Sequence, residues 1–386
     1  MLSDLPQELL ELIFTALDPE SLRACALVSS SLVAPSQRSI FRSLVIWFPD
    51  GDLPKAQALF SSAPHVTGYV RELKVQLEDE EVLSSQNGVL ASILPSFPHL
   101  ECLSIKGWFG PIRWNDTTLP LQSAIEELMT SSNLRSLDVE EIFDIPSSFI
   151  VLALSSLRRL GLHSITVEPS ESHIPNLPAT LRTEEISLRT QYPDVKSIVD
   201  LILPNIPRPG YLDKNRRLML GMHQVIHTES LRIIAATAST LRHLELRCGV
   251  FELPLDLPCL PVLRVLELRI FLGFSGPGLP PHLYPVVAAL PTTVPIIEVL
   301  CLTCYDVPGK EDWGADRAGP LPLFDDTCAY RDKLPYLRRV YCPDRPLDQE
   351  DYVAFHVFVL EKFSGLQGTG VLDISAGGDE GPPVLD

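Results

Sequence analysis

The chain has 386 residues, of which 45% are hydrophobic and 21% are charged, an ordinary globular composition that excludes wholesale disorder. Its 31 basic and 49 acidic residues give a net charge of −18, which makes nucleic acid a poor partner because the chain repels a phosphate backbone. A chain of this length predicts two units, or one small unit followed by an extended array.

The first residues include Asp4 and Glu8 but no basic stretch, so they do not resemble a signal peptide. No apolar run approaches the roughly 18 residues that a membrane-spanning helix needs. The eight cysteines have scattered spacings, which fit a reducing compartment better than a disulfide framework. We therefore expect an intracellular protein, cytoplasmic or nuclear or both, that has no membrane partner.

The first 48 residues predict three short helices. The segment 5–17 carries aliphatic and aromatic residues at helical spacing, which gives a wide apolar stripe. Asp18 and Pro19 are typical of the start of a second helix, as cap and first residue. A third segment is expected to start at Pro35 and to carry Ile40. Three short helices cannot bury this much apolar surface among themselves, so we expect the module to fold against another protein.

These residues resemble the F-box. The pattern is Leu5-Pro6-x-Glu8-Leu9-x3-Ile13-x3-Leu17-Asp18-Pro19-x2-Leu22-x2-Cys25-x2-Val28-Ser29. The continuation Gln37-Arg38-x2-Phe41-Arg42-Ser43-Leu44 resembles the version common in fungal F-box proteins, although Leu32 lies where many F-boxes have an aromatic residue. The resemblance implies binding to a Skp-type adaptor and, through it, to a cullin and a RING protein. The matching adaptor-binding positions are Leu5, Pro6, Leu9, Ile13, Leu17, Leu22 and Val28.

The rest of the chain repeats a pattern of aliphatic residues at i, i+3 and i+5, which ends like a short half-buried strand. Clear units begin at Val70, Leu100, Leu134, Leu157, Leu241, Leu263, Ile297 and Leu337, and a looser one at Thr183. The pattern resembles a leucine-rich repeat without its usual asparagine. Repetition predicts that neighbouring units stack and share a core. The interval 189–240 shows no clear unit and holds either an unrecognised repeat or an insertion.

The expected fold class is therefore α/β. A three-helix F-box spans residues 1–48, and an irregular leucine-rich-repeat solenoid spans residues 49–375. The solenoid is expected to be a horseshoe with parallel strands on its concave face. The segment 42–46 resembles a first strand directly after the third helix, and residues 376–386 are expected to form a disordered acidic tail.

Residues between the aliphatic positions of each strand are expected to face away from the core and to line the concave surface. There they include Glu245, Glu267 and Cys301, in a mixture of both charges without an aromatic row or a basic stripe. Arginine and tyrosine are good interface anchors. The residues favoured for binding a protein target are Arg247, Arg269, Arg339 and Tyr341. Tyr284 and Trp313, in loops rich in proline and glycine, are alternative contact points.

The sequence shows no catalytic, metal-binding or cofactor-binding motif. Cys301 and Cys304 match a C-x-x-C spacing, but a strand would point their sulfurs to opposite sides. His223 and His227 lack the glutamate of a zinc-protease helix. We therefore expect no enzyme, no metal and no cofactor.

The favoured function is the substrate-recognition subunit of an SCF-type ubiquitin ligase. The F-box would dock the adaptor, and the repeats would hold a protein target near the charged conjugating enzyme. The alternative is a leucine-rich-repeat scaffold without any connection to ubiquitin. An enzyme is the least favoured class, because it would need a polar pocket with convergent titratable groups.

Overall fold

The structure is a computed structural model. It describes residues 5–47, 52–77, 80–107, 112–131, 133–168, 181–189, 195–203, 211–222, 227–248, 256–271, 283–305, 332–342, 360, 363–367 and 369–374. The chain divides into two compact units, Met1–Pro178 and Ala179–Asp386. The predicted tail, residues 376–386, lies outside the described residues.

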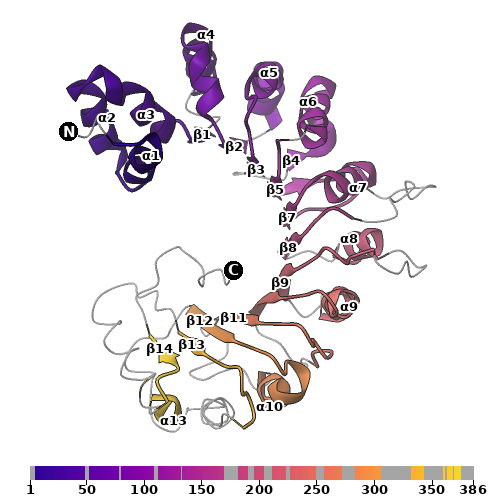
Figure 1. The fold of residues 1–386 in the computed structure, drawn as a ribbon. Coiled ribbons are helices and arrows are strands. Elements are labelled where there is room, and N and C mark those ends of the chain that lie inside the picture. Colours follow the sequence, from indigo (N-terminus) through magenta and orange to yellow (C-terminus); the bar gives the residue numbers. More distant parts are fainter. Residues whose placement is uncertain are drawn as a thin grey trace, which may run out of the picture. The chain divides into compact units, whose positions relative to one another are not determined.

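The first unit begins with three helices and continues as alternating strands and helices (Figure 1). The helices at its start are α1 (Gln7–Thr15), α2 (Pro19–Val28) and α3 (Ser30–Ile40). The strands that follow are β1 (Ser43–Trp47), β2 (Glu72–Leu77), β3 (Cys102–Gly107), β5 (Ser136–Glu140) and β7 (Arg159–His163). The helices between them are α4 (Asp52–Ser62), α5 (Glu80–Ile93), α6 (Leu119–Thr130) and α7 (Ser147–Ser156), with 3₁₀ turns η2 (Pro64–Tyr69), η3 (Leu94–Ser96) and η4 (Trp114–Asp116).

The strands of the first unit form a parallel sheet in the order β1-β2-β3-β5-β7, and Figure 1 shows α4 to α7 on one side of it. Equivalent positions of successive repeats are partners, as in Leu73↔Leu103 and Leu137↔Leu160. These four side chains are at most 1% exposed. The leucines therefore stack in a row beneath the helices, which is what a repeated strand pattern with one apolar face requires. A small second sheet pairs β4 (Ile112–Arg113) with β6 (Ile142–Phe143).

The second unit repeats this arrangement. Its parallel strands are β8 (Glu185–Arg189), β9 (Arg217–Met222), β10 (His243–Cys248), β11 (Val265–Phe271), β12 (Val299–Tyr305), β13 (Arg339–Tyr341) and β14 (Leu372–Asp373). The helices among its described residues are α8 (Val195–Ile202), α9 (His227–Thr237), α10 (Leu283–Thr293) and α13 (Ser364–Gln367). Leu218, Leu244, Leu266 and Leu300 are successive partners, and each is 0% exposed.

Each clear repeat of the sequence forms a strand, and so does the looser unit at Thr183, which precedes β8. The expected strand after the third helix is also confirmed, because β1 pairs with β2 from Ser43↔Glu72 to Trp47↔Gln76. Residues 43–47 therefore belong to the sheet, although the predicted boundary of the helical module was residue 48.

The interval 189–240 holds one unrecognised repeat, β9, whose unit begins with Asn215 instead of an aliphatic residue. Asn215 is 0% exposed. None of the described residues donates a hydrogen bond to its side-chain oxygen or accepts one from its side-chain nitrogen. The repeat was missed because the pattern begins with a polar residue, although that residue occupies the same buried position as its aliphatic counterparts.

The third helix begins earlier than predicted. It starts at Ser30, and Pro35 lies inside it. The Oγ of Ser29 accepts a hydrogen bond from the backbone N–H of Ser31 at 3.3 Å, which caps the helix. The expectation that Pro35 begins the helix was wrong, because the serine cap outweighs the usual preference of proline for the first helical turn.

The buried amide of Asn215 predicts a stabilising substitution. We expect Asn215→Leu to raise the free energy of unfolding by about 1–3 kcal/mol, because it removes buried polar atoms that have no partner among the described residues and restores the aliphatic residue of the other repeats. Urea denaturation followed by circular dichroism measures this change. The reciprocal variant Leu241→Asn, at the same position of the next repeat, should lower the stability. A loss of stability in Asn215→Leu would show that this amide has a structural partner.

Candidate protein-interaction site

Helix α1 has two apolar faces, and the small helical module buries only one of them. Leu10 and Phe14 are 8% and 2% exposed and form a core with Leu22 and Leu32. The side chains that pack partly buried against this core are Leu5, Leu17, Cys25 and Ile40. Three short helices thus obtain a single small core, which uses one side of α1.

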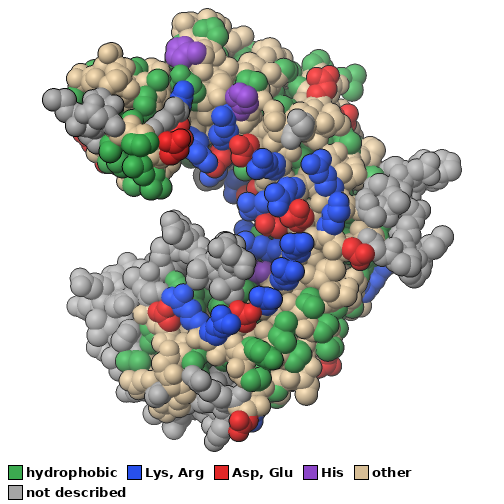
Figure 2. Space-filling view, in the orientation of Figure 1, with side chains coloured by type: hydrophobic (Ala, Val, Ile, Leu, Met, Phe, Trp, Pro, Cys, Tyr) green, Lys and Arg blue, Asp and Glu red, His purple; other side chains and the backbone are tan. Residues whose placement is uncertain are grey.

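The other apolar face of α1 is open to solvent. Leu9, Leu12 and Ile13 are 47%, 68% and 38% exposed, and their spacing of three and four residues places them on one side of the helix. Figure 2 shows hydrophobic side chains gathered over α1. Large apolar side chains that gather on a surface in this way mark a site where another protein binds.

The end of α2 adds two more exposed apolar side chains. Leu27 is 89% exposed and Val28 is 78% exposed. They lie in the last turn of α2, directly before Ser29, which ends that helix and caps α3. We refer to Leu9, Leu12, Ile13, Leu27 and Val28 together as the exposed apolar set.

The two helices that carry these side chains start differently. Pro6 is the N-terminal boundary residue of α1 and is exposed. Asp18 caps α2, as predicted, and its Oδ1 accepts hydrogen bonds from the backbone N–H groups of Glu20 and Ser21, both at 2.9 Å. The Ser21 hydroxyl donates to Oδ2 at 2.6 Å. The hydroxyl and N–H of Ser21 lower the pKa of the Asp18 carboxyl, so the cap stays ionised at neutral pH.

The structure divides the predicted adaptor-binding residues into two groups. Leu22 lies in the core of the module, and Leu5 and Leu17 pack against that core. The residues whose side chains are exposed to solvent are Pro6, Leu9, Ile13 and Val28. Leu12 and Leu27 were not predicted, although both are more exposed than Leu9. The signal that could have found them is their helical spacing, because Leu12 lies three residues after Leu9.

A comparison with known protein families finds a match for this helical module. Residues 2–46 match the F-box-like family. A comparison with curated proteins finds no matching protein. The match ends one residue before the end of β1, so it covers the three helices and most of the first strand. The N-terminal module of this chain is therefore an F-box-like domain, and F-box domains generally bind Skp-type adaptors.

The exposed apolar set can supply part of the free energy of such a complex. Covering five partly exposed aliphatic side chains is worth on the order of 5–10 kcal/mol. Association itself costs about 4–15 kcal/mol in lost translational and rotational freedom. A stable complex therefore needs further contacts around this set, and exposed Pro6 lies at the start of the same helix.

The residues predicted to bind a target lie on the sheet face opposite the leucine rows of the second unit. Arg247 of β10 and Arg269 of β11 are register partners, as are Glu245 and Glu267. The Nε of Arg269 lies 2.9 Å from Glu245 Oε1 and 2.7 Å from Glu267 Oε1. The Nε of Arg247 lies 3.0 Å from Glu245 Oε1. Both arginines are thus neutralised by acidic residues of the sheet itself.

The expected exposure of this face is wrong for several residues. Glu245, Glu267, Cys301 and Tyr341 are 0%, 1%, 1% and 9% exposed, respectively, so they are buried. Arg269 reaches Glu267 on its own strand and Glu245 on β10, and Arg247 reaches Glu245 within β10. These arginine side chains help to explain why the carboxylates are covered. The polar residues of this face therefore form an internal network in place of the open surface that we expected.

Arg339 and Tyr341 form a second pair on β13. The Arg339 guanidinium carbon lies 5.2 Å from the centre of the Tyr341 ring, a favourable cation–π arrangement. Arg339 also forms an ion pair with Asp373 of β14.

More exposed arginines lie one position before β10, β11 and β13. They are Arg242, Arg264 and Arg338. The prediction missed them because they precede the alternating part of each repeat. Tyr284 lies in α10, and Trp313 is outside the described residues.

The ionisation of the buried Glu267 carboxyl depends on its neighbours. Burial by itself raises the pKa of Glu267, but the His243 imidazole and the positive charge of Arg269 outweigh burial, so the pKa is lower than usual. The imidazole Nε2 lies 3.7 Å from Glu267 Oε2. The carboxylate form is therefore favoured in the folded protein, and its network is intact at neutral pH.

The C-x-x-C cysteines and the two spaced histidines of the sequence belong to no metal-binding cluster among the described residues. Burial, followed by the charge of Glu267, raises the pKa of the Cys301 thiol to about 12, which makes it a poor nucleophile at neutral pH. His223 lies outside the described residues. Across the part of the chain that the structure describes, no three His, Cys, Asp or Glu side chains cluster to hold a metal ion. Within the same residues, no helix is long and apolar enough to cross a membrane.

The lowered pKa of Glu267 predicts a pH-dependent stability. A folded-state pKa below the unfolded value stabilises the fold above pH 4.5, the ordinary value, and this contribution is lost as the pH falls through the folded pKa. We expect Glu267→Gln to flatten the stability profile of the second unit in this acidic window. At pH 7 the variant should lose about 1–3 kcal/mol, because Arg269 loses one of its two carboxylate partners and keeps Glu245.

Urea denaturation at a series of pH values from about 3 to about 7 measures both effects, because the slope of stability against pH counts the protons taken up on unfolding. The exposed carboxyl group of Asp332 offers a control, and Asp332→Asn should leave the profile nearly unchanged. If Glu267→Gln and the unaltered protein had parallel profiles, the network would not depend on the Glu267 charge.

Proposed function

We propose that this protein is the substrate-recognition subunit of an SCF-type ubiquitin ligase. The observation that carries the proposal is the exposed apolar set on helices that match the F-box-like family. A partner that covers these side chains removes them from water, and the Skp-type adaptor is the partner that F-box domains generally bind. Through the adaptor, the chain would join a cullin and a RING protein.

We further propose that the strands and helices after the F-box form leucine-rich-repeat solenoids that hold a protein target. The support is the register of the strands, in which equivalent leucines of successive repeats are partners. Such arrays present one face of their strands as an extended binding surface. In this role the chain positions the target for a charged conjugating enzyme and supplies no reacting group. The role places it in the cytoplasm or the nucleus.

The target would contact the exposed arginines before the strands more readily than the buried network behind them. Arg338 and Arg264 both pair with Glu298, yet their side chains are 75% and 47% exposed. Arg269 is 15% exposed and is shared by two carboxylates. Exposed arginine is a common anchor of protein interfaces. Arg264 and Arg338 are therefore better candidates for target binding than Arg247 and Arg269.

The adaptor contact predicts a specific loss of binding. We expect the double variant Leu9→Asp, Ile13→Asp to abolish co-purification of a Skp-type adaptor, because two charges would have to be buried in an apolar interface. Neither side chain belongs to the module's core, so the variant should stay folded. Affinity purification followed by mass spectrometry measures the adaptor and cullin peptides, and circular dichroism checks the fold.

A matched control is Leu119→Asp, which changes an equally apolar and 76% exposed side chain on α6. This control should retain the adaptor. Undiminished adaptor recovery in a folded double variant would refute the proposed contact. If the unaltered protein recovered no adaptor, the repeat scaffold without a ubiquitin function would become the better assignment.

A further inference from the structure

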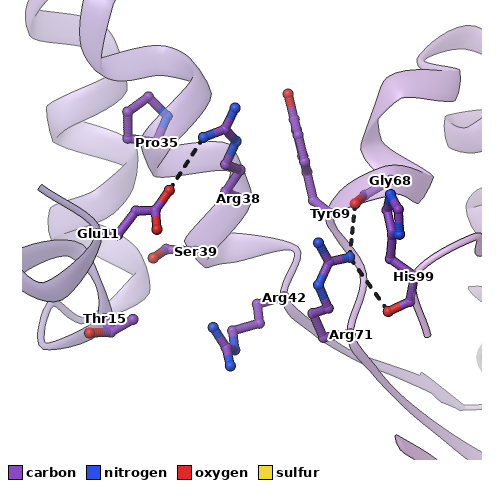
Figure 3. Close-up of a pocket in the computed structure, with 10 residues that line it drawn as sticks. All are labelled: Glu11, Thr15, Pro35, Arg38, Ser39, Arg42, Gly68, Tyr69, Arg71 and His99. Atoms are coloured by element: carbon purple, nitrogen blue, oxygen red, sulfur yellow. Dashed lines mark hydrogen bonds and ion pairs between the residues drawn. The ribbon is translucent and has the colours of Figure 1, made fainter. Parts of the chain in front are cut away.

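A basic cleft lies beside the F-box-like helices, on the side that faces the first repeats. Its volume is about 340 Å³, within the range of sites that bind small molecules. Figure 3 shows residues of α1 and α3 on one side and the segments around η2 and β2 on the other. All of these residues belong to the first unit.

The lining of the cleft is positively charged in a chain that is strongly acidic. Arg38, Arg42 and Arg71 line it, and the one acidic residue of the lining is Glu11. Three positive charges against one negative charge leave a balance of +2, in contrast with the chain's net charge of −18. Glu101 lies outside the lining, 3.7 Å from Arg71 Nε, and the balance stays positive when it is counted.

Arg71 is held in a fixed position. Its Nη1 donates hydrogen bonds to the carbonyl oxygens of Gly68 at 3.0 Å and His99 at 3.5 Å. Figure 3 shows these bonds as dashed lines. The carbonyl groups orient the guanidinium without neutralising it, and its 3.7 Å ion pair with Glu101 is a weak, partly exposed one. Arg71 is therefore already placed for a ligand and loses little freedom on binding.

Arg38 and Arg42 complete the group. The Nη1 of Arg38 lies 3.4 Å from Glu11 Oε1, and both side chains are about half exposed, so this ion pair is weak and can be replaced. The Arg38 guanidinium carbon lies 5.8 Å from the centre of the Tyr69 ring. Arg42 is exposed, and no side-chain contact with the rest of the described chain holds its guanidinium.

The repeat geometry brings Arg42 and Arg71 together. The carbonyl oxygen of Arg42 accepts hydrogen bonds from the N–H groups of Arg71 and Glu72, at 2.8 and 3.0 Å. Each residue directly precedes its strand, β1 or β2, and neighbouring strands lie about 4.8 Å apart. The backbone thus places Arg42 and Arg71 side by side at the starts of adjacent strands, and α3 adds Arg38 to the same cleft.

We propose that this cleft binds the dianionic phosphate group of a phosphate monoester. Such a group carries a charge of about −1.5 to −2 at pH 7, opposite in sign to the positive balance of the lining. Guanidinium groups form paired hydrogen bonds with phosphate oxygens, and the hydroxyl groups of Ser39 and Tyr69 are further possible donors in the lining. The phosphate is carried either by a protein side chain or by a small molecule.

This site does not depend on the proposed ligase function, because it can be tested on the full-length chain alone. Isothermal titration calorimetry would use two probes, inorganic phosphate and an acetylated Gly-phosphoserine-Gly amide, with the unphosphorylated peptide as a blank. We expect saturable binding of at least one phosphate probe that weakens as salt is added. Tighter binding of the phosphopeptide assigns the phosphate to a protein, and binding of inorganic phosphate at least as tight assigns it to a small molecule.

Substitutions locate the site. Arg42→Gln should weaken binding by about tenfold or more, which corresponds to the loss of one charge-assisted contact. Arg135 precedes β5 in the same way, is exposed and does not line the cleft, so Arg135→Gln should leave binding unchanged. The Arg42→Gln variant should also stay folded and still co-purify with the adaptor. Failure of the phosphate site can therefore be told apart from failure of the proposed ligase function. The site is refuted if neither probe binds, if Arg42→Gln binds normally, or if both variants lose affinity equally.

Discussion

The constraint on which the proposed function depends is that α1 has more apolar surface than its own module can bury. Leu10 and Phe14 occupy one face and build the core with Leu22 and Leu32, while Leu9, Leu12 and Ile13 stay open on the other. A helix of nine residues is too short to be stable by itself, so α1 depends on its buried face for structure. The open face is then available for a second protein, and the two roles are separated by about a third of a helical turn.

In the repeats, the backbone pairing of the strands sets the spacing between equivalent residues. The side chains on each face of a sheet then determine what that face does. The leucines of successive strands are partners and fill the core beneath the helices. The opposite face of the second unit carries Glu245 and Glu267, which are bridged by Arg269. The residue just before many strands is an arginine, as in Arg42, Arg71 and Arg135. The parallel strands of the first unit thus support an apolar core and a row of basic side chains, and those of the second unit support an apolar core and an internal polar network.

The sequence was sufficient to predict the features that follow from local periodicity. It failed where a polar residue occupies an aliphatic position and where two residues could each start the same helix. The strands at the clear repeats were predictable because their aliphatic residues recur at fixed spacing. The strand β9 was missed because Asn215 occupies an aliphatic position, and the start of α3 was misplaced because Ser29 caps it ahead of Pro35.

Burial was harder to predict than secondary structure. Leu22 and Ile13 are both F-box positions, yet only the packing of α1, α2 and α3 shows that one is core and the other is surface. In the same way, alternation placed Tyr341 away from the leucines but did not show that it is buried. The basic cleft had no signal in the sequence, since Arg38 and Arg71 lie 33 positions apart and meet only in the fold.

The most direct test of the central claim is hydroxyl-radical footprinting of the full-length protein, free and in the presence of a purified Skp-type adaptor. Leu9, Leu12 and Ile13 should be oxidised in the free protein and protected in the complex, while exposed Leu119 should react equally in both samples. Equal oxidation of α1 with and without bound adaptor would contradict the claim, because the adaptor would then be held elsewhere and the open face of α1 would have another purpose.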